Sequence, residues 1–323
     1  MAGTNGKHHS TRKRAPSSRD GARRLERQAE RFRQAPLRPS DPDLRPKGQL
    51  LIIGGHEDKE DAKLILRYLA QHVRGGSLVV SALASEEPES MWRQYQRVFR
   101  GLGVRHVRKL SIESREEAES PKSLRVLEDA TAVFLTGGDQ LRITSLLGDT
   151  PVYSRLLEIF SNGGMIAGTS AGASVMSETM LVGGGRNGSH RIGPDLQLAP
   201  GFGFAKDMVI DQHFAERGRI GRLFAVVAQN PRVLGIGLDE NTAIALSPNS
   251  DFRVLGEGAV YVVDGSSVTD SNIAEEDRDR TMSLYNVTVH VLTQGDRFAI
   301  KTRTPKSRPA KEVDAELGVE TSG

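Results

Sequence analysis

The sequence predicts an α/β protein in which helices cover both faces of a mostly parallel sheet. Apolar strands alternate with amphipathic helices over residues 49–176, which is the rhythm of a parallel sheet crossed by helices. Two of these strands run into paired glycines, the first pair beginning at Gly54 and the second at Gly137. Ligand sites in such sheets lie beyond the carboxyl ends of the strands, so we expect a site near these turns.

The first part of the pattern is regular. Residues 49–55 read as a buried strand that ends in a glycine turn, and residues 60–73 have the apolar spacing of a helix. A strand over 77–83, an amphipathic helix over 91–103 that ends in glycine, and a strand over 104–112 follow. Each helix is long enough to cross from one strand to a parallel neighbour.

The second part repeats the theme and then changes. Residues 130–139, "ATAVFLTGGD", form an apolar strand that ends in two glycines and an acid, and two helical segments fill residues 140–162. A short strand over 164–168 stands directly before Ser170. After residue 231 short strands are separated by turn residues with little room for helix, so we expect antiparallel strands added toward the C-terminus.

We expect one folded domain over residues 49–302, with a disordered tail at each end. Residues 1–48 hold 13 Lys and Arg against 5 Asp and Glu, a net charge of +8, whereas the whole chain carries +3. Few apolar residues and many arginines predict disorder there, with a transient helix near residues 22–34. Residues 303–323 read in the same way. The basic tail leaves contact with nucleic acid open, but a solvated extension is expected.

Composition excludes several kinds of chemistry. The 323 residues include no cysteine, which excludes disulfides, thiolate metal sites and a cysteine nucleophile. No apolar run approaches the roughly 18 residues needed to span a bilayer, and the N-terminus lacks an apolar signal segment. We therefore expect a cytoplasmic protein that does not contact a membrane, and any covalent catalysis must use a side chain other than cysteine.

Ser170 is the first candidate for that side chain. It lies in "GTSAG", which matches the G-x-S-x-G elbow that lifts a serine hydroxyl between a strand and a helix. The following helix would offer the amide of Ala171 to a developing oxyanion. The alternative is a polar residue at a glycine-rich corner, which has no catalytic role.

A serine nucleophile needs a base, and His213 has the best position among the eight histidines. It follows the apolar strand "DMVI" and precedes a helix, so it lies at a strand end where it could meet Ser170. His56 follows the first glycine turn and could border the site. Asp239 and Glu240 follow another apolar strand and are candidates for the acid that orients the base, or else form a solvated acidic turn.

Five motifs together resemble a known family. "IIGGHEDK", "FLTGGDQLRI", "GTSAGASVM", "VIDQHFAERGRIGRL" and "GIGLDENTA", in this order, resemble the cyanophycinases, serine exopeptidases related to peptidase E. The resemblance covers roughly residues 49–265. It implies a three-layer α/β sandwich like that of the class I glutamine amidotransferases, with serine in place of their cysteine.

The resemblance also implies roles for the site residues. Ser170 is the nucleophile, His213 its base, and the amides of Gly138 and Ala171 form the oxyanion hole. The family's acid has been placed either shortly after the nucleophile or in the "DEN" motif. Residues 181–193 contain no carboxylate, so Glu240 is the choice, with Asp239 as the second candidate.

Cyanophycin has an aspartate backbone with an arginine on each side chain, and the family releases β-aspartyl-arginine dipeptides from it. A substrate with both signs of charge needs a pocket with both signs. With the resemblance, the pocket candidates are Gln140, Asp211, Gln212, Arg217, Arg219 and Arg222.

The resemblance thus implies a cyanophycinase that forms an acyl-enzyme on Ser170 and requires neither metal nor cofactor. The family resemblance suggests a homodimer, and the partner expected is cyanophycin or a related aspartyl or arginyl peptide. Two alternatives stay open. One is a peptidase E-like dipeptidase that acts on aspartyl or isoaspartyl peptides, and the other is a non-catalytic protein that binds a polymer.

Overall fold

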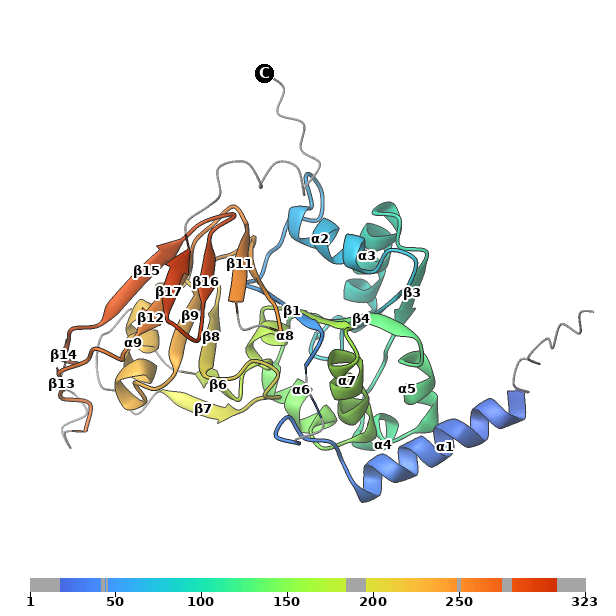
Figure 1. Ribbon diagram of the computed structural model, residues 1–323. Coiled ribbons are helices and arrows are strands. Elements are labelled where there is room, and N and C mark those ends of the chain that lie inside the picture. Colours follow the sequence, from blue (N-terminus) through green and yellow to red (C-terminus); the bar gives the residue numbers. More distant parts are fainter. Residues whose placement is uncertain are drawn as a thin grey trace, which may run out of the picture.

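Helices gather around one half of a large sheet, and a smaller sheet stands beside the other half (Figure 1). This arrangement comes from a computed structural model. It describes residues 18–41, 44, 46–183, 196–248, 251–274 and 281–306.

Five strands form the parallel half of the large sheet, in the order β1-β5-β4-β2-β3. Every neighbouring pair in this half is parallel, which confirms the predicted mostly parallel α/β core. Four of the strands are short and mostly apolar, as is typical where both faces of a sheet are covered, whereas β3, at the edge, carries mostly polar side chains. The five strands are β1 (Gln49–Ile53), β2 (Ser77–Ser81), β3 (His106–Lys109), β4 (Ala130–Leu135) and β5 (Met165–Thr169).

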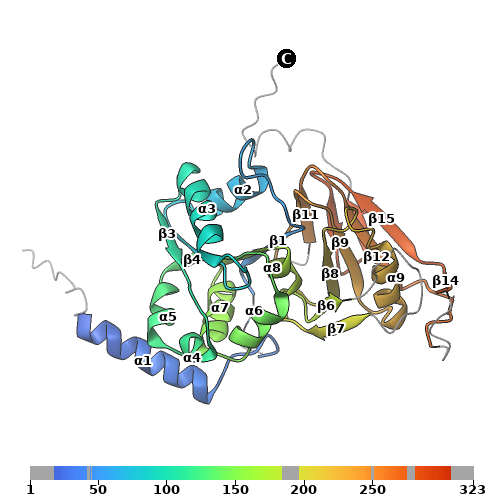
Figure 2. The ribbon, with the colours of Figure 1, turned by 180° about the vertical axis from the view of Figure 1, so that it is seen from behind.

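Helices cover the two faces of this half, as alternation along β1 shows. Leu51 and Ile53 pack in one apolar cluster with α2 and α3, whereas Leu50 and Ile52 pack in another with helices of the opposite face. Figure 2 shows the same layers from behind. The helices of the two faces are α2 (Leu64–His72), α3 (Pro88–Gly101), α4 (Arg115–Ala118), α5 (Pro121–Val126), α6 (Gln140–Leu147), α7 (Pro151–Ser161) and α8 (Ala171–Ser174).

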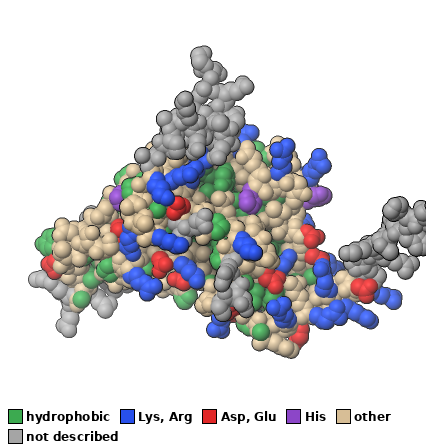
Figure 3. Space-filling model, viewed as in Figure 1, with side chains coloured by type: hydrophobic (Ala, Val, Ile, Leu, Met, Phe, Trp, Pro, Cys, Tyr) green, Lys and Arg blue, Asp and Glu red, His purple; other side chains and the backbone are tan. Residues whose placement is uncertain are grey.

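The basic N-terminal segment contains a packed helix, α1 (Ser18–Gln34), where sequence analysis expected disorder with a transient helix. Leu25, Ala29 and Phe32 are buried, and the helix lies against α5 and α7. These three residues fall at i, i+4 and i+7, so they form one narrow apolar stripe that the many arginines conceal in the composition. Arginines cover the exposed side of α1 (Figure 3).

Four antiparallel strands extend the large sheet beyond β1, in the order β10-β11-β16-β17. Strands of this kind are predicted from the sequence after residue 231, but β17 lies beyond residue 302, where a disordered tail is expected. The apolar side chains of the inner two are buried, whereas β17 is exposed at the edge. They are β10 (Thr242–Leu246), β11 (Asp251–Gly256), β16 (Arg297–Ala299) and β17 (Thr304–Lys306).

A separate four-stranded sheet, in the order β15-β12-β9-β8, packs beside this extension. Within it β8 and β9 are parallel neighbours, so their carboxyl ends lie at the same edge. The sequence does not predict this second sheet, because an apolar strand pattern does not say which sheet the strand joins. Its strands are β8 (Met208–Gln212), β9 (Leu234–Leu238), β12 (Val260–Asp264) and β15 (Thr288–Leu292).

The second sheet is also covered on both faces. Helix α9 (Ile220–Gln229) places Leu223 and Val227 on one face, and the other face contributes Ile210 and Ile236 to the main core. None of the helices in the described ranges is both long and apolar enough to cross a membrane. Two small hairpins complete the described structure: β6 (Thr179–Gly183) with β7 (Gln197–Pro200), and β13 (Asp270–Ser271) with β14 (Leu284–Tyr285).

Candidate active site

Ser170 occupies a strained turn between β5 and α8. Its φ of 54° and ψ of −113° lie in a region that a residue with a side chain rarely adopts. The glycines of the motif are sterically required. A Cβ on Gly168 would stand 2.3 Å from the carbonyl oxygen of Gly172, and one on Gly172 would stand 2.2 Å from that of Leu135. The elbow therefore forms because glycine stands two positions to either side of the serine.

His213 meets Ser170 from the second sheet. It follows β8 directly, is buried, and places Nε2 2.9 Å from the hydroxyl oxygen of Ser170. Its ring lies against Gly55, where a Cβ would stand only 2.3 Å from the ring atom Cε1. His213 also has a positive φ, 48°, so base and nucleophile both sit in strained backbone.

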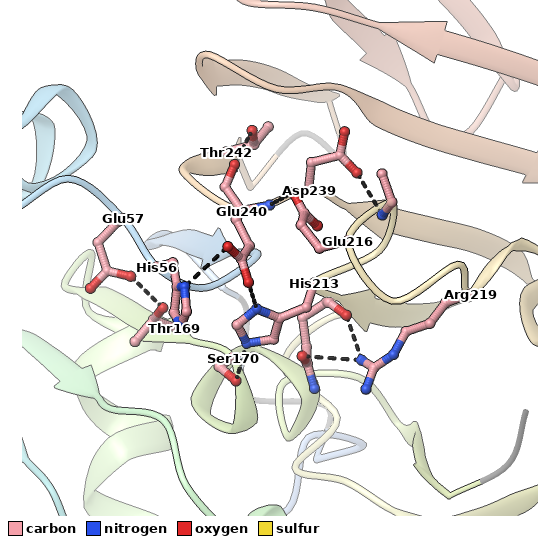
Figure 4. A network of polar contacts seen from close by, with 12 residues as sticks. His56, Glu57, Thr169, Ser170, His213, Glu216, Arg219, Asp239, Glu240 and Thr242 are labelled. Carbon is pink, nitrogen blue, oxygen red and sulfur yellow. Dashed lines mark hydrogen bonds and ion pairs between the residues drawn. The ribbon is translucent and has the colours of Figure 1, made fainter. Parts of the chain in front are cut away.

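Glu240 completes the line of polar contacts (Figure 4). It follows β9, the parallel neighbour of β8, and its Oε1 lies 2.6 Å from Nδ1 of His213. Its second oxygen, Oε2, lies 3.0 Å from Nδ1 of His56. The backbone N–H of Glu240 donates to Oε1 of Glu216 at 3.0 Å. Ser170, His213 and Glu240 thus have the spacing of a Ser-His-acid triad.

Asp239, the second candidate for the acid, is used elsewhere. One of its carboxylate oxygens accepts the backbone N–H of Ala215, and the other accepts that of Ala259, each at 3.0 Å. The side chain is buried. Asp239 therefore fastens the loop after His213 to the strand connection beyond β11 and does not contact the imidazole in the structure.

The end of β1 holds the three site segments together through its backbone. The carbonyl oxygens of residues 53, 54 and 55 accept, in order, the N–H groups of Ser170, His213 and Asn241 at 3.0, 2.8 and 2.8 Å. Asn241 is the residue after Glu240. Three consecutive carbonyls thus set the spacing of Ser170, His213 and the segment of Glu240 without using any side chain.

Burial and charge set the protonation of the base. Burial lowers the pKa of His213 below its ordinary value of 6.5, and the charge of Arg217 lowers it further, while the hydrogen bond to Glu240 works in the opposite direction. The pKa of Glu240 is also lowered: burial raises it, but the hydrogen bonds and charges of the two histidines outweigh that effect. At neutral pH the imidazole is therefore available as a base and the carboxylate is ionised.

The predicted oxyanion-hole residues lie beside the serine turn. Ala171 is the first residue of α8 and is buried. Gly138 has a φ of 138°, and a Cβ there would stand 1.9 Å from the carbonyl oxygen of Ala84. Its neighbour Gly137 faces Ser170, because a Cβ on Gly137 would stand 3.7 Å from the hydroxyl oxygen. The glycine turn after β4 is thus the backbone that borders the nucleophile.

The predicted pocket residues contact one another in part. Asp211 is buried and binds Arg222, whose Nε lies 2.6 Å from Oδ2, and Arg219, whose Nη1 lies 3.2 Å from Oδ1. Arg219 also donates to the side-chain oxygen of Gln212 at 3.2 Å. Burial lowers the pKa of Arg219 to about 10. This cluster, residues 211, 212, 219 and 222, is formed by the two residues before His213 and by two arginines of the segment that follows it.

Two of the predicted pocket residues lie outside that cluster. Gln140, at the start of α6, donates from Nε2 to the backbone carbonyl oxygen of Leu181 at 2.5 Å. Arg217 is exposed. The structure therefore keeps Arg217 available to an incoming anion, whereas Gln140 joins α6 to β6.

Sequence reasoning missed Glu57, which lies buried beneath the site. Its Oε2 accepts the hydroxyl of Thr169, the residue before the nucleophile, at 2.6 Å, and its Oε1 accepts the hydroxyl of Tyr95. Lys59 adds an ion pair at 3.2 Å. An acid two positions after Gly55, in the motif "IIGGHEDK", was the only signal in the sequence.

One group in the described part of the chain has the donor atoms of a metal site. His56, His213 and Glu240 each offer a nitrogen or oxygen atom, and these three atoms lie within 4.8 Å of one another. Imidazole nitrogens and carboxylate oxygens are ligands that zinc accepts.

The α/β sandwich and the contacts among Ser170, His213 and Glu240 define the class of protein: a serine-type hydrolase. Comparisons give the family. Residues 50–254 match the model of peptidase family S51. A cyanophycinase from Thermosynechococcus vestitus is 38% identical over 259 residues, which is 79% of this chain and 80% of that protein. One from Nostoc sp. is 38% identical over 261 residues, 80% of this chain and 87% of that protein.

The chain belongs to peptidase family S51. A crystal structure of a peptidase from an acI-B1 Actinobacterium aligns with a TM-score of 0.58 over 79% of this chain and 98% of that one. At 22% identity this likeness supports the fold alone.

Proposed function

We propose that the protein is a serine exopeptidase that hydrolyses cyanophycin to β-aspartyl-arginine dipeptides. The observation that carries this proposal is the contact of Ser170 with His213 at 2.9 Å and of His213 with Glu240 at 2.6 Å, in a chain whose relatives are named cyanophycinase. The three side chains have the order of contacts that activates a serine.

Acylation begins at Ser170. The serine oxygen attacks the α-peptide carbonyl carbon of the aspartate backbone while Nε2 of His213 takes the hydroxyl proton. Glu240 keeps the proton of the imidazole on Nδ1 and stabilises the imidazolium that forms. The protonated imidazole then gives its proton to the leaving amine, and the acyl-enzyme remains on the serine oxygen.

Deacylation repeats these steps with water. His213 takes a proton from a water molecule, the hydroxide adds to the ester carbon, and Ser170 leaves with the proton returned. In both tetrahedral intermediates the backbone amides of Gly138 and Ala171 are the groups we assign to the oxyanion. The strained turn is useful here because it directs the hydroxyl and the amide of the next residue toward the same carbonyl group.

Charged groups beside His213 suit a substrate with both signs of charge. Arg217 is exposed and suits a carboxylate, and the cluster of residues 211, 212, 219 and 222 contains two arginines against one aspartate. We assign the free carboxylate of the substrate's arginyl group to Arg217, with Gln140, Asp211, Gln212, Arg219 and Arg222 shaping the pocket around the released unit.

The test is incubation of the purified protein with cyanophycin, followed by identification of the soluble product by mass. We expect β-aspartyl-arginine from the wild type. The Ser170→Ala protein should fold and lose about 10⁴–10⁶-fold in turnover, as in other triads. Turnover near the wild-type rate in that variant would contradict the assignment of the nucleophile.

Two further outcomes separate the alternatives. Release of products from aspartyl or isoaspartyl peptides, with cyanophycin left intact, would indicate a peptidase E-like dipeptidase. Labelling with a fluorophosphonate probe tests the non-catalytic alternative, because only an activated serine reacts. We expect labelling of the wild type and none of Ser170→Ala.

The organisation of the chain stays a prediction. We infer a single peptidase domain that includes residues 49–302 and, beyond those bounds, the packed helix α1 and the edge strand β17. We also infer a homodimer and a place in the cytoplasm. Light scattering on the purified protein measures the oligomeric state, and a mass close to that of one 35.2 kDa chain would contradict the homodimer.

A further inference from the structure

One carboxylate in the candidate active site contacts two imidazole rings. Glu240 places Oε1 on Nδ1 of His213 at 2.6 Å and Oε2 on Nδ1 of His56 at 3.0 Å. The two rings meet edge to face with their centres 5.2 Å apart (Figure 4). His213 is buried, but the side chain of His56 is 75% exposed. A catalytic triad uses only the first of these contacts, so the second histidine needs an explanation.

We propose that His56, Glu240 and His213 form a site for a divalent transition-metal ion such as zinc, and that the bound ion reversibly inhibits the enzyme. Two imidazoles and a carboxylate are the protein ligands of many zinc sites, with a fourth position left to water. The three donor atoms already lie within 4.8 Å of one another. The exposed side of His56 gives the ion a way in from solvent.

Two of the proposed ligands, His213 and Glu240, are also held in place by backbone contacts that do not use their donor atoms. The backbone N–H of His213 donates to the carbonyl oxygen of residue 54, and that of Glu240 donates to Glu216. His56 directly follows Gly54 and Gly55, the glycine turn whose first carbonyl oxygen accepts the N–H of His213. Glu57, the other nearby acid, is buried and engaged by Thr169, Tyr95 and Lys59, so it is not a ligand.

Inhibition follows from the chemistry of imidazole. In the active triad Nδ1 of His213 carries the proton, which it donates to Glu240, and the lone pair of Nε2 accepts the hydroxyl of Ser170. A metal ion bound at Nδ1 takes the lone pair of that nitrogen and displaces its proton. The neutral ring then carries its one proton on Nε2, where it can only donate to Ser170. The base is lost although every side chain remains in the site.

The binding arm of the test does not depend on the substrate. Calorimetric titration of Ser170→Ala protein with Zn²⁺ should give one ion per chain, and Co²⁺ should give the absorption bands of a low-symmetry site. His56→Ala in the same background should weaken binding at least about tenfold, because one of three ligands is removed. His106→Ala, which removes an exposed imidazole on β3, should leave the affinity unchanged. Equal binding in all three proteins would overturn the proposal.

The inhibition arm rests on the proposed roles of Ser170 and His213. Fluorophosphonate labelling of the wild type should slow at least about tenfold in saturating Zn²⁺ and recover after a chelator is added. His56→Ala should need at least about tenfold more Zn²⁺ for the same slowing, each protein being compared with its own rate without metal. Equal sensitivity of wild type and His56→Ala would overturn the proposal.

The two proposals can fail separately. If cyanophycin is not cleaved but Zn²⁺ binds through His56 and slows labelling, the proposed substrate is wrong and the metal site stands. If cyanophycin is cleaved and Zn²⁺ has no effect on labelling, the metal site is wrong and the proposed function stands.

Discussion

The two sheets of the molecule contribute different parts of one active site. The parallel half of the large sheet provides Ser170 at the end of β5, between layers of helices that cover both faces. The second sheet provides His213 and Glu240 at the ends of β8 and β9, which are parallel neighbours. The proposed nucleophile and the two residues proposed to activate it therefore belong to two different sheets that meet at one edge.

This division separates two demands on the structure. The elbow around Ser170 needs small residues, since Gly168 and Gly172 face backbone atoms that exclude any side chain. The second sheet needs correct register, because a shift of one residue between β8 and β9 would move Glu240 away from His213. The contact of Ser170 with His213 and Glu240 requires both the small residues of the elbow and the correct register of β8 and β9.

Among changes that compare the two sheets, the largest effect should come from the acid that we assign to the second sheet. Glu240→Gln keeps the size of the side chain but removes the charge that holds the proton of His213 on Nδ1, so kcat should fall about 10²–10⁴-fold. Asp239→Asn is the matched control one residue away. It should lower the free energy of unfolding, because Asp239 accepts two backbone N–H groups, yet retain more activity than Glu240→Gln.

Kinetics and urea denaturation of both variants measure these effects. A greater loss of kcat in Asp239→Asn than in Glu240→Gln, at a temperature where both are folded, would reverse the assignment of the acid.

A second pair of substitutions compares the cores of the two sheets. Phe134, on β4 of the large sheet, packs against Tyr95 and Phe99 of α3. Phe214, just after β8 of the second sheet, packs against Tyr261. Both are buried, so each change to alanine should cost about 3–5 kcal/mol of stability. Only Phe214→Ala should also lower the activity of the folded protein, because it adjoins His213, the proposed base.

Denaturation gives the stability of each variant, and initial rates well below the melting temperature give its activity. Equal residual activity in the two variants would show that the second sheet does not position the base more closely than the first.

A smaller effect is expected at the glycine turn between the sheets. A side chain at Gly55 would strike the ring of His213, so Gly55→Ala should lower kcat/KM about 10²-fold by displacing the base. Gly75 is the control, because it also has a positive φ, 83° against 107°, but no atom lies within 4 Å of its added Cβ. Both variants carry backbone strain, and only the first has the clash. Rates measured at equal folded fraction test this difference; equal rates would contradict it.

The smallest effect concerns pH. The pKa of His213 is below 6.5, so the acid limb of kcat/KM should have its midpoint below pH 6.5. Arg217 is one cause, and Arg217→Gln should move that limb to higher pH by a fraction of a pH unit. The unfolded chain binds more protons at this histidine, so its contribution to stability is present above pH 6.5 and is lost as pH falls. A pH profile of both proteins is the measurement, and an unmoved limb would contradict the role of Arg217.

Much of the site could be predicted from the sequence because its residues stand at strand ends. Ser170, His213 and Glu240 each follow an apolar run, and the structure brings all three together. The parallel core could also be predicted, since the alternation of strands and helices along the sequence indicates its fold class. The choice between Asp239 and Glu240 came from the family resemblance, because adjacent acids look the same in a sequence.

The remaining features depend on which distant elements meet. Strand periodicity does not say that β8 and β9 form their own sheet, and composition hides the three buried apolar residues of α1. His56 was noted at the turn, but its contact with the second oxygen of Glu240 depends on the loop after β9. The pairing of Asp211 with two arginines was also hidden, because a charge run does not reveal its partners.

The three carbonyls at the end of β1 have a consequence for how the protein acquires activity. They bind segments that lie far away in the sequence, so the site closes only when the most distant parts of the chain have met. During refolding, helical signal should therefore recover before catalytic turnover does. Catalysis in this protein would then be a late kinetic marker, one that reports the docking of the two sheets rather than the formation of either.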